Sequence, residues 1–92
     1  MAKVIWKFPL ETIATQAIEM PRHAEILTVQ VQRGVPSLWA VVDPDRVQQK
    51  RHFAIYGTGH LMPELEMGAE RKYIGTYQLA DGGLVFHVFE EG

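Results

Sequence analysis

Tyr73-Ile74-Gly75-Thr76-Tyr77-Gln78-Leu79, Ala80-Asp81-Gly82-Gly83 and Leu84-Val85-Phe86-His87-Val88-Phe89 follow one another in the last third of the chain. Two runs rich in β-branched and aromatic residues flank a short turn segment that contains aspartate and glycine. This pattern predicts a β-hairpin over residues 73–89. It also places a histidine, His87, inside a strand among apolar neighbours.

The length and the composition limit the number of domains and the size of the core. The chain has 92 residues, which predicts a single domain over residues 1–92. A domain of this size buries only roughly 60–65% of its unfolded surface, so its core is thin. The chain has no cysteine, so neither a disulfide nor a thiolate zinc site reinforces it. We therefore expect a homo-oligomer, a common remedy for so small a core.

The charge and the hydropathy pattern exclude several classes of partner. The net charge of -2 gives no strong field, so we expect no nucleic-acid partner. No apolar run approaches the roughly 20 residues that span a bilayer, and the start of the chain lacks a signal-peptide core. We expect a cytoplasmic protein without a membrane partner and without a cofactor.

Alternating residues predict further strands. The clearest alternation covers residues 27–32, where Leu27, Val29 and Val31 should face inward. Residues 37–42 return as its hairpin partner, and residues 3–8 and 52–56 are also rich in strand formers. Trp6 and Trp39 fit packing in the core.

Three segments are less regular. Residues 15–20 form either a strand or a helical turn, and the periodicity does not decide between them. Residues 46–51 are polar and basic, and Asp45 could cap one helical turn there. Residues 61–72 predict a long loop. Together these segments predict an all-β or β-dominated fold, a small antiparallel barrel or sandwich of roughly six to seven strands built from hairpins.

Several motifs together resemble a known protein family. They are Ser37-Leu38-Trp39-Ala40-Val41-Val42-Asp43-Pro44, Gly57-Thr58-Gly59-His60, the terminal hairpin and the opening Val4-Ile5-Trp6-Lys7-Phe8-Pro9-Leu10. They look like a family of small proteins of tailed phages and prophages with a domain of unknown function. The resemblance implies a genomic setting in which small proteins often bind host factors or signalling molecules. It carries no catalytic residue over to this chain.

Gly57-Thr58-Gly59-His60 is the leading candidate for a ligand site. Two glycines let backbone N–H groups approach a ligand, and the Thr58 hydroxyl could bind a phosphate or a carbonyl. His60 could add a donor or a base. The alternative is a strand end or bulge that uses glycine for its backbone conformation. Lys50 and Arg51 belong to the only basic cluster, and we expect one of them to reach a phosphate at this site.

Two further features remain open. His87 is either a buried histidine with a backbone partner or a residue that lines a pocket or a subunit interface. Gly75-Thr76 repeats Gly57-Thr58, so the two pairs either lie on neighbouring strands or mark a sharp strand bend. The four histidines lack a short paired spacing, so we expect no metal site.

The sequence favours a binding protein over an enzyme. Ser37 is the only serine and no acid or base is visibly arranged around it, so no catalytic residue is assigned. We expect a non-enzymatic phage or prophage protein that counters host defence by sequestering a nucleotide-type signal or by blocking a host protein. The alternatives are a structural or assembly accessory of a phage and, third, a small hydrolase with His60 or His87 as general base.

Overall fold

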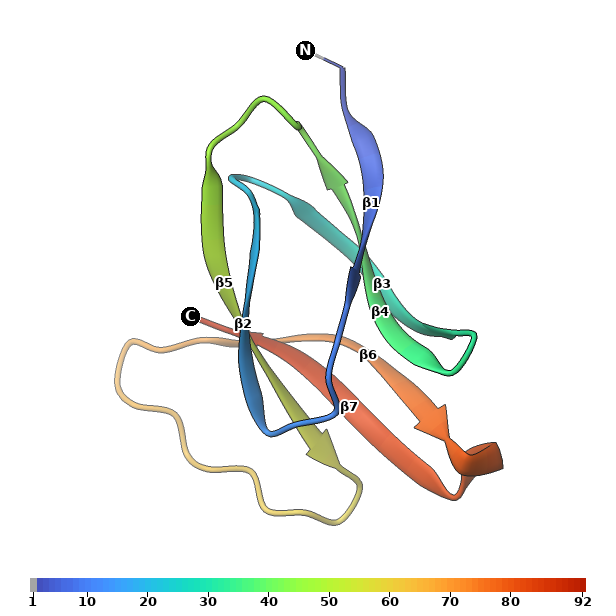
Figure 1. Cartoon of the computed structure of the whole chain (residues 1–92). Helices are drawn as coiled ribbons and strands as arrows, with labels where there is room; N and C mark the ends of the chain where they lie inside the picture. The colour runs from blue at the N-terminus through green and yellow to red at the C-terminus, as the bar shows by residue number, and fades with distance from the viewer. Residues whose placement is uncertain (1) are drawn as a thin grey trace.

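The computed structural model describes residues 2–92, and its regular elements are strands apart from one short 3-10 turn (Figure 1). The prediction of an all-β fold is therefore confirmed, and residues 15–20 form a strand. The seven strands and one short 3-10 turn are β1 (Val4–Pro9), β2 (Thr15–Pro21), β3 (Glu25–Gln32), β4 (Val35–Val42), β5 (Gln48–Gly57), β6 (Arg71–Leu79), η1 (Ala80–Gly82) and β7 (Leu84–Glu91).

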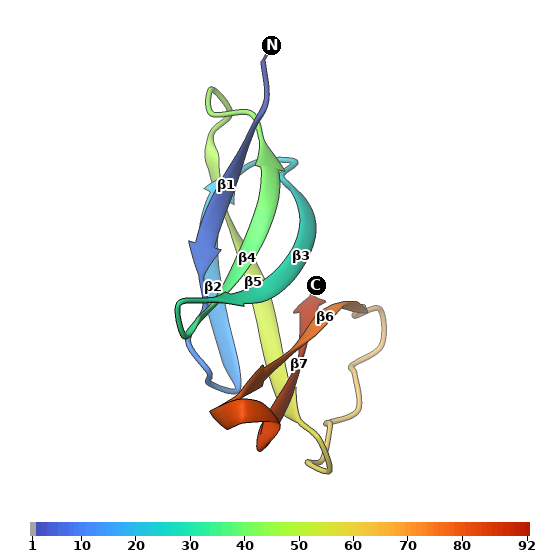
Figure 2. The ribbon, with the colours of Figure 1, turned by 90° about the vertical axis from the view of Figure 1, so that its right-hand side faces the viewer.

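The strands form two antiparallel sheets that pack as an open sandwich. One sheet has the order β1-β4-β3 and the other has the order β2-β5-β7-β6. The two predicted hairpins are present as β3–β4 and β6–β7. The sheets meet along β3 and β6, and β1 and β2 connect them at the other side (Figure 2). Strand pairing does not continue around the molecule, so the sandwich does not close into a barrel.

The core lies between the two sheets and is built from alternate residues of the central strands. Leu38, Ala40 and Val42 of β4 face Phe53 of β5 and Val88 of β7, and all five are at most 1% exposed. This alternation is what a sheet with one buried face requires. The two tryptophans are not part of the buried core. Trp39 points to the other face of its sheet, and Trp6 is 40% exposed on the edge strand β1.

A bulge changes the predicted alternation in β3. The pairing with β4 shifts between Ile26 and Thr28, so one extra residue lies on the β3 side. A bulge re-aims the side chains that precede it. Val29 and Val31 face inward as expected, whereas Leu27 is 45% exposed and Ile26 takes its place against the core.

A second bulge lies opposite, in β6 between Tyr73 and Gly75. A Cβ at Gly75 would lie only 2.8 Å from Val29 Cγ1, so glycine allows β6 to approach β3 closely. Beside this close contact the two bulges part the strands. A hollow of about 350 Å³ opens there, and it is lined by Arg51 and Glu90 among others.

The polar segments differ in part from their predicted form. Residues 48–51 continue β5, so the predicted helical turn at 46–51 is wrong. Asp43, rather than Asp45, supports the turn, because its Oδ1 accepts the backbone N–H of Asp45 at 3.0 Å. Residues 58–70 form a long loop without regular structure, so the loop predicted at 61–72 is confirmed up to residue 70, and residues 71–72 begin β6. Within residues 2–92 there is no helix of the length and apolarity needed to cross a membrane.

Candidate functional site

Polar and aromatic side chains gather on the outer face of the four-stranded sheet, the face turned away from the core. In β5, Lys50, His52 and Tyr56 alternate with the buried residues Phe53 and Ile55, so they point outward. The neighbouring strands β7 and β6 add Glu91 and Arg71 to the same face. The register places His52 and Arg71 directly opposite Glu91 on either side.

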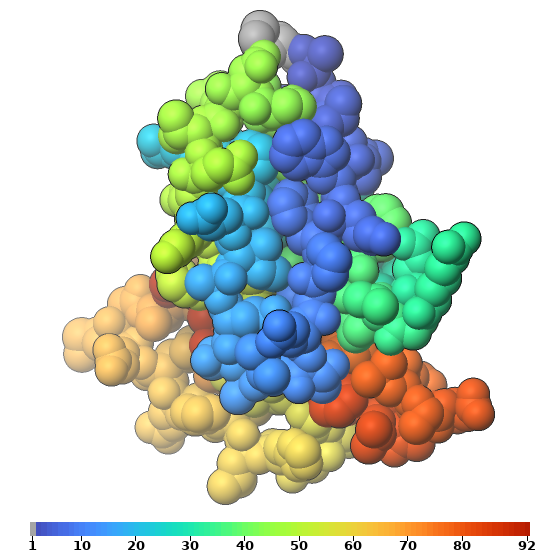
Figure 3. Space-filling model, in the orientation of Figure 1, coloured from blue at the N-terminus to red at the C-terminus, as the bar shows by residue number. Residues whose placement is uncertain are grey.

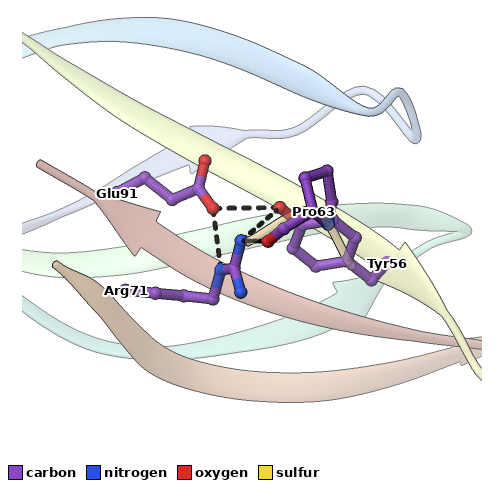
Figure 4. Close-up of polar contacts among 4 residues, drawn as sticks. All are labelled: Tyr56, Pro63, Arg71 and Glu91. Atoms are coloured by element: carbon purple, nitrogen blue, oxygen red, sulfur yellow. Dashed lines mark hydrogen bonds and ion pairs between the residues drawn. The ribbon is translucent and has the colours of Figure 1, made fainter. Parts of the chain in front are cut away.

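Arg71, Glu91 and Tyr56 form a hydrogen-bonded cluster on this face (Figure 4). Arg71 Nε donates to Glu91 Oε2 at 2.9 Å, and the Tyr56 hydroxyl donates to the same oxygen at 2.9 Å. Arg71 Nη2 also donates to the carbonyl of Pro63 at 2.8 Å. Charge-assisted bonds of this kind hold a geometry firmly. Arg71 therefore ties the irregular loop 58–70 to the sheet.

The cluster changes the titration of two of its members. Burial raises the pKa of Tyr56, and the nearby Glu91 carboxylate raises it further. The hydrogen bond to Glu91 raises the pKa of Arg71, which stays charged throughout. On the opposite side of the same sheet, burial raises the pKa of Tyr77.

The raised pKa of Tyr56 predicts a loss of stability in alkali. The unfolded chain begins to lose phenol protons at the ordinary pKa of 10.0, while Tyr56 in the folded protein keeps its proton. The stabilisation is thus fully present below pH 10.0 and is lost as the pH rises through the folded-state pKa. The free energy of unfolding should fall with pH in this range, and it should fall less steeply in Tyr56→Phe. Urea unfolding at a series of alkaline pH values measures both slopes. Equal slopes would contradict the assignment.

The loop 58–70 and the end of β7 enclose a groove in two parts. Strand β7 ends at Glu91, opposite His52, whereas β5 begins earlier, at Gln48. The first residues of β5 therefore lack a neighbour on that side. A hollow of about 440 Å³ surrounds this gap, and a second of about 470 Å³ lies between the loop and the sheet. Both hollows are lined by His52, Glu91 and Gly92, so we treat them as one end groove. Figure 3 shows the gap between the loop and β2.

The two parts of the end groove differ in chemistry. The part at the start of β5 is lined by His23, Lys50 and His52, and none of these forms an ion pair within the described residues. Glu19 lies opposite Lys50 on β2, and it is the carboxylate that faces this lysine from the neighbouring strand. The part beneath the loop has an apolar wall and three carboxylates, two of them on the loop and one, Glu91, on the sheet. It is lined on the loop side by Pro63, Glu64, Leu65, Glu66 and Ala69.

Arg51 borders the groove but is already bound. Its Nε and Nη2 donate to the two carboxylate oxygens of Glu90 at 2.6 and 2.8 Å, and Nη1 donates to the carbonyl of Ala24. The guanidinium is on the inner face of β5, because side chains two residues apart in a strand share a face and Phe53 faces the core. Arg51 thus holds β5, β7 and the β2–β3 turn together rather than reaching outward to a ligand.

The structure does not bring Lys50 or Arg51 to the Gly57-Thr58-Gly59-His60 element. The basic pair lies at the start of β5 and Gly57 at its end, about 20 Å away at roughly 3.3 Å per residue. Gly57, Thr58 and His60 line a small hollow of about 190 Å³. The His60 ring covers Gly57, where a Cβ would lie 2.7 Å from Nδ1. Gly59 has a φ of +85° in the turn that follows β5.

His87 joins both predicted Gly-Thr pairs. Its Nε2 is 2.7 Å from Thr58 Oγ1 and its Nδ1 is 2.9 Å from Thr76 Oγ1. Tyr73 extends the chain, because its hydroxyl is 2.6 Å from Thr76 Oγ1. Strands β5 and β6 are not neighbours, but both flank β7, which explains how the two pairs meet at one histidine. His87 is half-buried with hydroxyl partners instead of a backbone partner.

Sequence reasoning missed Tyr56, Arg71 and Glu91. Their strands were predicted in part, but the contact depends on the register of three strands and on the loop that Arg71 anchors. Within residues 2–92 the hydrogen-bond partners of the His87 side chain are the hydroxyls of Thr58 and Thr76, and the Tyr73 hydroxyl bonds to Thr76 in turn. Within residues 2–92 no three metal-ligating side chains of histidine, aspartate or glutamate converge.

The comparisons with known proteins give the family and no activity. The model of a domain of unknown function, DUF7352, matches residues 1–92. The chain therefore belongs to this family. No curated protein and no solved structure matches the chain significantly.

Proposed function

We propose that the protein is a non-enzymatic binding protein that holds a small nucleotide-type ligand in the end groove. The observation that carries the proposal is the division of this groove into a cationic part and an apolar part. His23, Lys50 and His52 line the first, and Pro63, Leu65 and Ala69 line the second. A nucleotide has the same division between its phosphate and its base.

The size of the groove supports this ligand class. Hollows of about 440 and 470 Å³ lie within the range of pockets that hold small molecules, roughly 300–1,000 Å³. The hollow at Gly57-Thr58-Gly59-His60 measures only about 190 Å³ and is partly filled by the His60 ring. The proposal keeps Lys50 as the phosphate-binding residue and places the ligand at the opposite end of β5 from this element.

The arrangement of charges supports one orientation of the ligand. Arg51 and Arg71 are neutralised by Glu90 and Glu91, whereas Lys50 forms no ion pair within residues 2–92, and the imidazoles of His23 and His52 can donate beside it. Beneath the loop, Glu64 and Glu66 offer acceptors that suit the exocyclic amine of a base and repel a phosphate. The phosphate therefore lies toward Lys50 and the base toward Leu65.

The biological setting in the proposal is that of a phage or prophage protein in the host cytoplasm. There it would counter a host defence by sequestering a nucleotide-type signal. The resemblance to phage and prophage proteins supports this setting. Sequestration requires the protein to bind the signal and does not require a catalytic residue, so a binding groove is sufficient for it.

Calorimetric titration with adenosine 5′-monophosphate and with adenosine tests the proposal. Lys50→Ala should weaken binding of the monophosphate roughly ten- to a hundredfold, because a charge-assisted bond contributes about 1.5–3 kcal/mol. It should leave adenosine binding unchanged. Leu65→Ala should weaken both ligands to the same degree, since it removes apolar contact with the base.

A matched control separates the two candidate sites. Thr58→Val removes a hydroxyl at the Gly57-Thr58-Gly59-His60 element and should leave both affinities unchanged. If Thr58→Val weakens the monophosphate while Lys50→Ala does not, the ligand binds at the far end of β5. If the monophosphate does not bind the wild-type protein, the nucleotide proposal is wrong.

A further inference from the structure

The loop 58–70 exposes apolar side chains that the groove does not use. Leu61 is 95% exposed and Met67 is 104% exposed, with Met62 at 43%. None of the three lines the end groove. Small monomeric proteins rarely keep several large apolar residues together in solvent. We call the segment 61–67 the apolar arm.

The apolar arm is extended and has few internal partners. Residues 61–66 contain no turn, bend, helix or strand. The Pro63 carbonyl is held by Arg71, which fixes the arm at its middle, and backbone bonds close the loop only near its two ends. Figure 2 shows the loop that contains the arm curving outward beside the sheet, and the Arg71 bond to Pro63 joins the two. The arm is therefore presented as a preformed segment for another surface.

Strand β1 offers a surface of matching chemistry. It is an edge strand of the three-stranded sheet, so one side of its backbone pairs with no other strand within residues 2–92. Its side chains Val4, Ile5 and Trp6 are 41%, 60% and 40% exposed. Lys3 and Lys7 flank them, whereas Glu64 and Glu66 lie within the arm. The two surfaces are thus both apolar, and their charges are opposite.

We propose that the apolar arm of one molecule packs along the β1 edge of a second copy of this chain. The arm and β1 lie on opposite sides of the molecule, so they cannot satisfy each other within one copy (Figure 1). Contact between two different surfaces of identical chains is head-to-tail, and it builds a ring or a chain of copies. The small size of the domain favours such an assembly. The proposal shares Glu64 and Glu66 with the ligand proposal, but its apolar contacts Leu61, Met62 and Met67 do not line the end groove, and assembly requires no bound ligand.

Two variants that each lose one surface test the proposal. Leu61→Asp with Met67→Asp replaces the two most exposed apolar side chains of the arm by charges. Lys3→Glu with Lys7→Glu reverses the charge of the β1 edge. All four side chains are exposed, so both variants should keep the wild-type circular dichroism spectrum. Sedimentation of the wild-type protein should give a mass above the 10.4 kDa of one chain. Each variant alone should sediment as a monomer.

Mixing the two variants decides the geometry. The intact β1 edge of the first variant can accept the intact arm of the second, so an equimolar mixture should form a dimer and nothing larger. A second test reverses the charges on both surfaces of one chain, by adding Glu64→Lys and Glu66→Lys to the edge variant, and this should restore assembly. A wild-type monomer at hundred-micromolar concentration would overturn the proposal. So would a mixture that stays monomeric.

Discussion

Phe53→Ala should lower the free energy of unfolding by about 3–5 kcal/mol, a large part of the stability of so small a domain. Phe53 is 1% exposed and is the largest of the fully buried side chains. It lies in the middle of β5, between β2 and β7 of the same sheet, and faces the other sheet. Removing the ring loses its transfer energy and leaves a cavity that the thin core cannot refill. Chemical denaturation measures the change, provided that the unfolding free energy of both proteins depends equally steeply on the denaturant concentration.

Trp39→Ala is the matched control for this prediction. Tryptophan is the larger side chain, but Trp39 is only partly buried, and it lies on the outer face of the three-stranded sheet beneath Lys7 at 6.0 Å. Its removal opens no closed cavity, so the loss should be clearly smaller than that for Phe53→Ala. If Trp39→Ala is the more destabilising change, the position of the core between the two sheets is wrong.

Arg51→Ala should lower the free energy of unfolding by about 2–3 kcal/mol. The Arg51 and Glu90 side chains are 18% and 21% exposed and share two hydrogen bonds. Removing Arg51 leaves a partly buried carboxylate without its partner, and this is the costly way to break such a pair. It also releases the carbonyl of Ala24 in the β2–β3 turn. Urea unfolding measures the loss.

The double variant Arg51→Met with Glu90→Leu distinguishes the loss of the ion pair from the cost of leaving one unpaired charge partly buried. Both charges are then absent, so no unpaired group remains, and the double variant should lie within about 1 kcal/mol of the wild type. It should therefore be more stable than Arg51→Ala. A double variant as unstable as the single one would mean that Arg51 acts through its contact with Ala24 alone.

The strands could be predicted from local sequence because their alternation is local. The turn at residues 80–83 and the alternation in 27–32 needed no long-range contact, and both hairpins are present. Leu27 was wrongly predicted to face inward, because the alternation of apolar and polar residues does not reveal a bulge. Trp39 was wrongly predicted to lie in the core, because β4 is apolar on both faces and its sequence does not show which face the second sheet covers.

Only the part of the candidate site that depends on the type of a single residue could be predicted from the sequence. Lys50 was found as part of a basic cluster, and it lines the end groove. Arg51 carries the same charge but points to the opposite face, where Glu90 binds it. The groove itself depends on where β7 ends relative to β5 and on how Arg71 holds Pro63. Both are properties of the strand register, which the chain sets through contacts between distant segments.

The most direct test of the central claim, a nucleotide-type ligand in the end groove, is a map of amide chemical shifts during titration with adenosine 5′-monophosphate. We predict shifts at Lys50, His52 and Leu65 and at Gly92, with the amides of Gly57 and Gly59 unchanged. The same titration with Lys50→Ala should need a higher concentration to reach the same shifts. Shifts confined to Gly57-Thr58-Gly59-His60, or no shifts at millimolar ligand, would contradict the account.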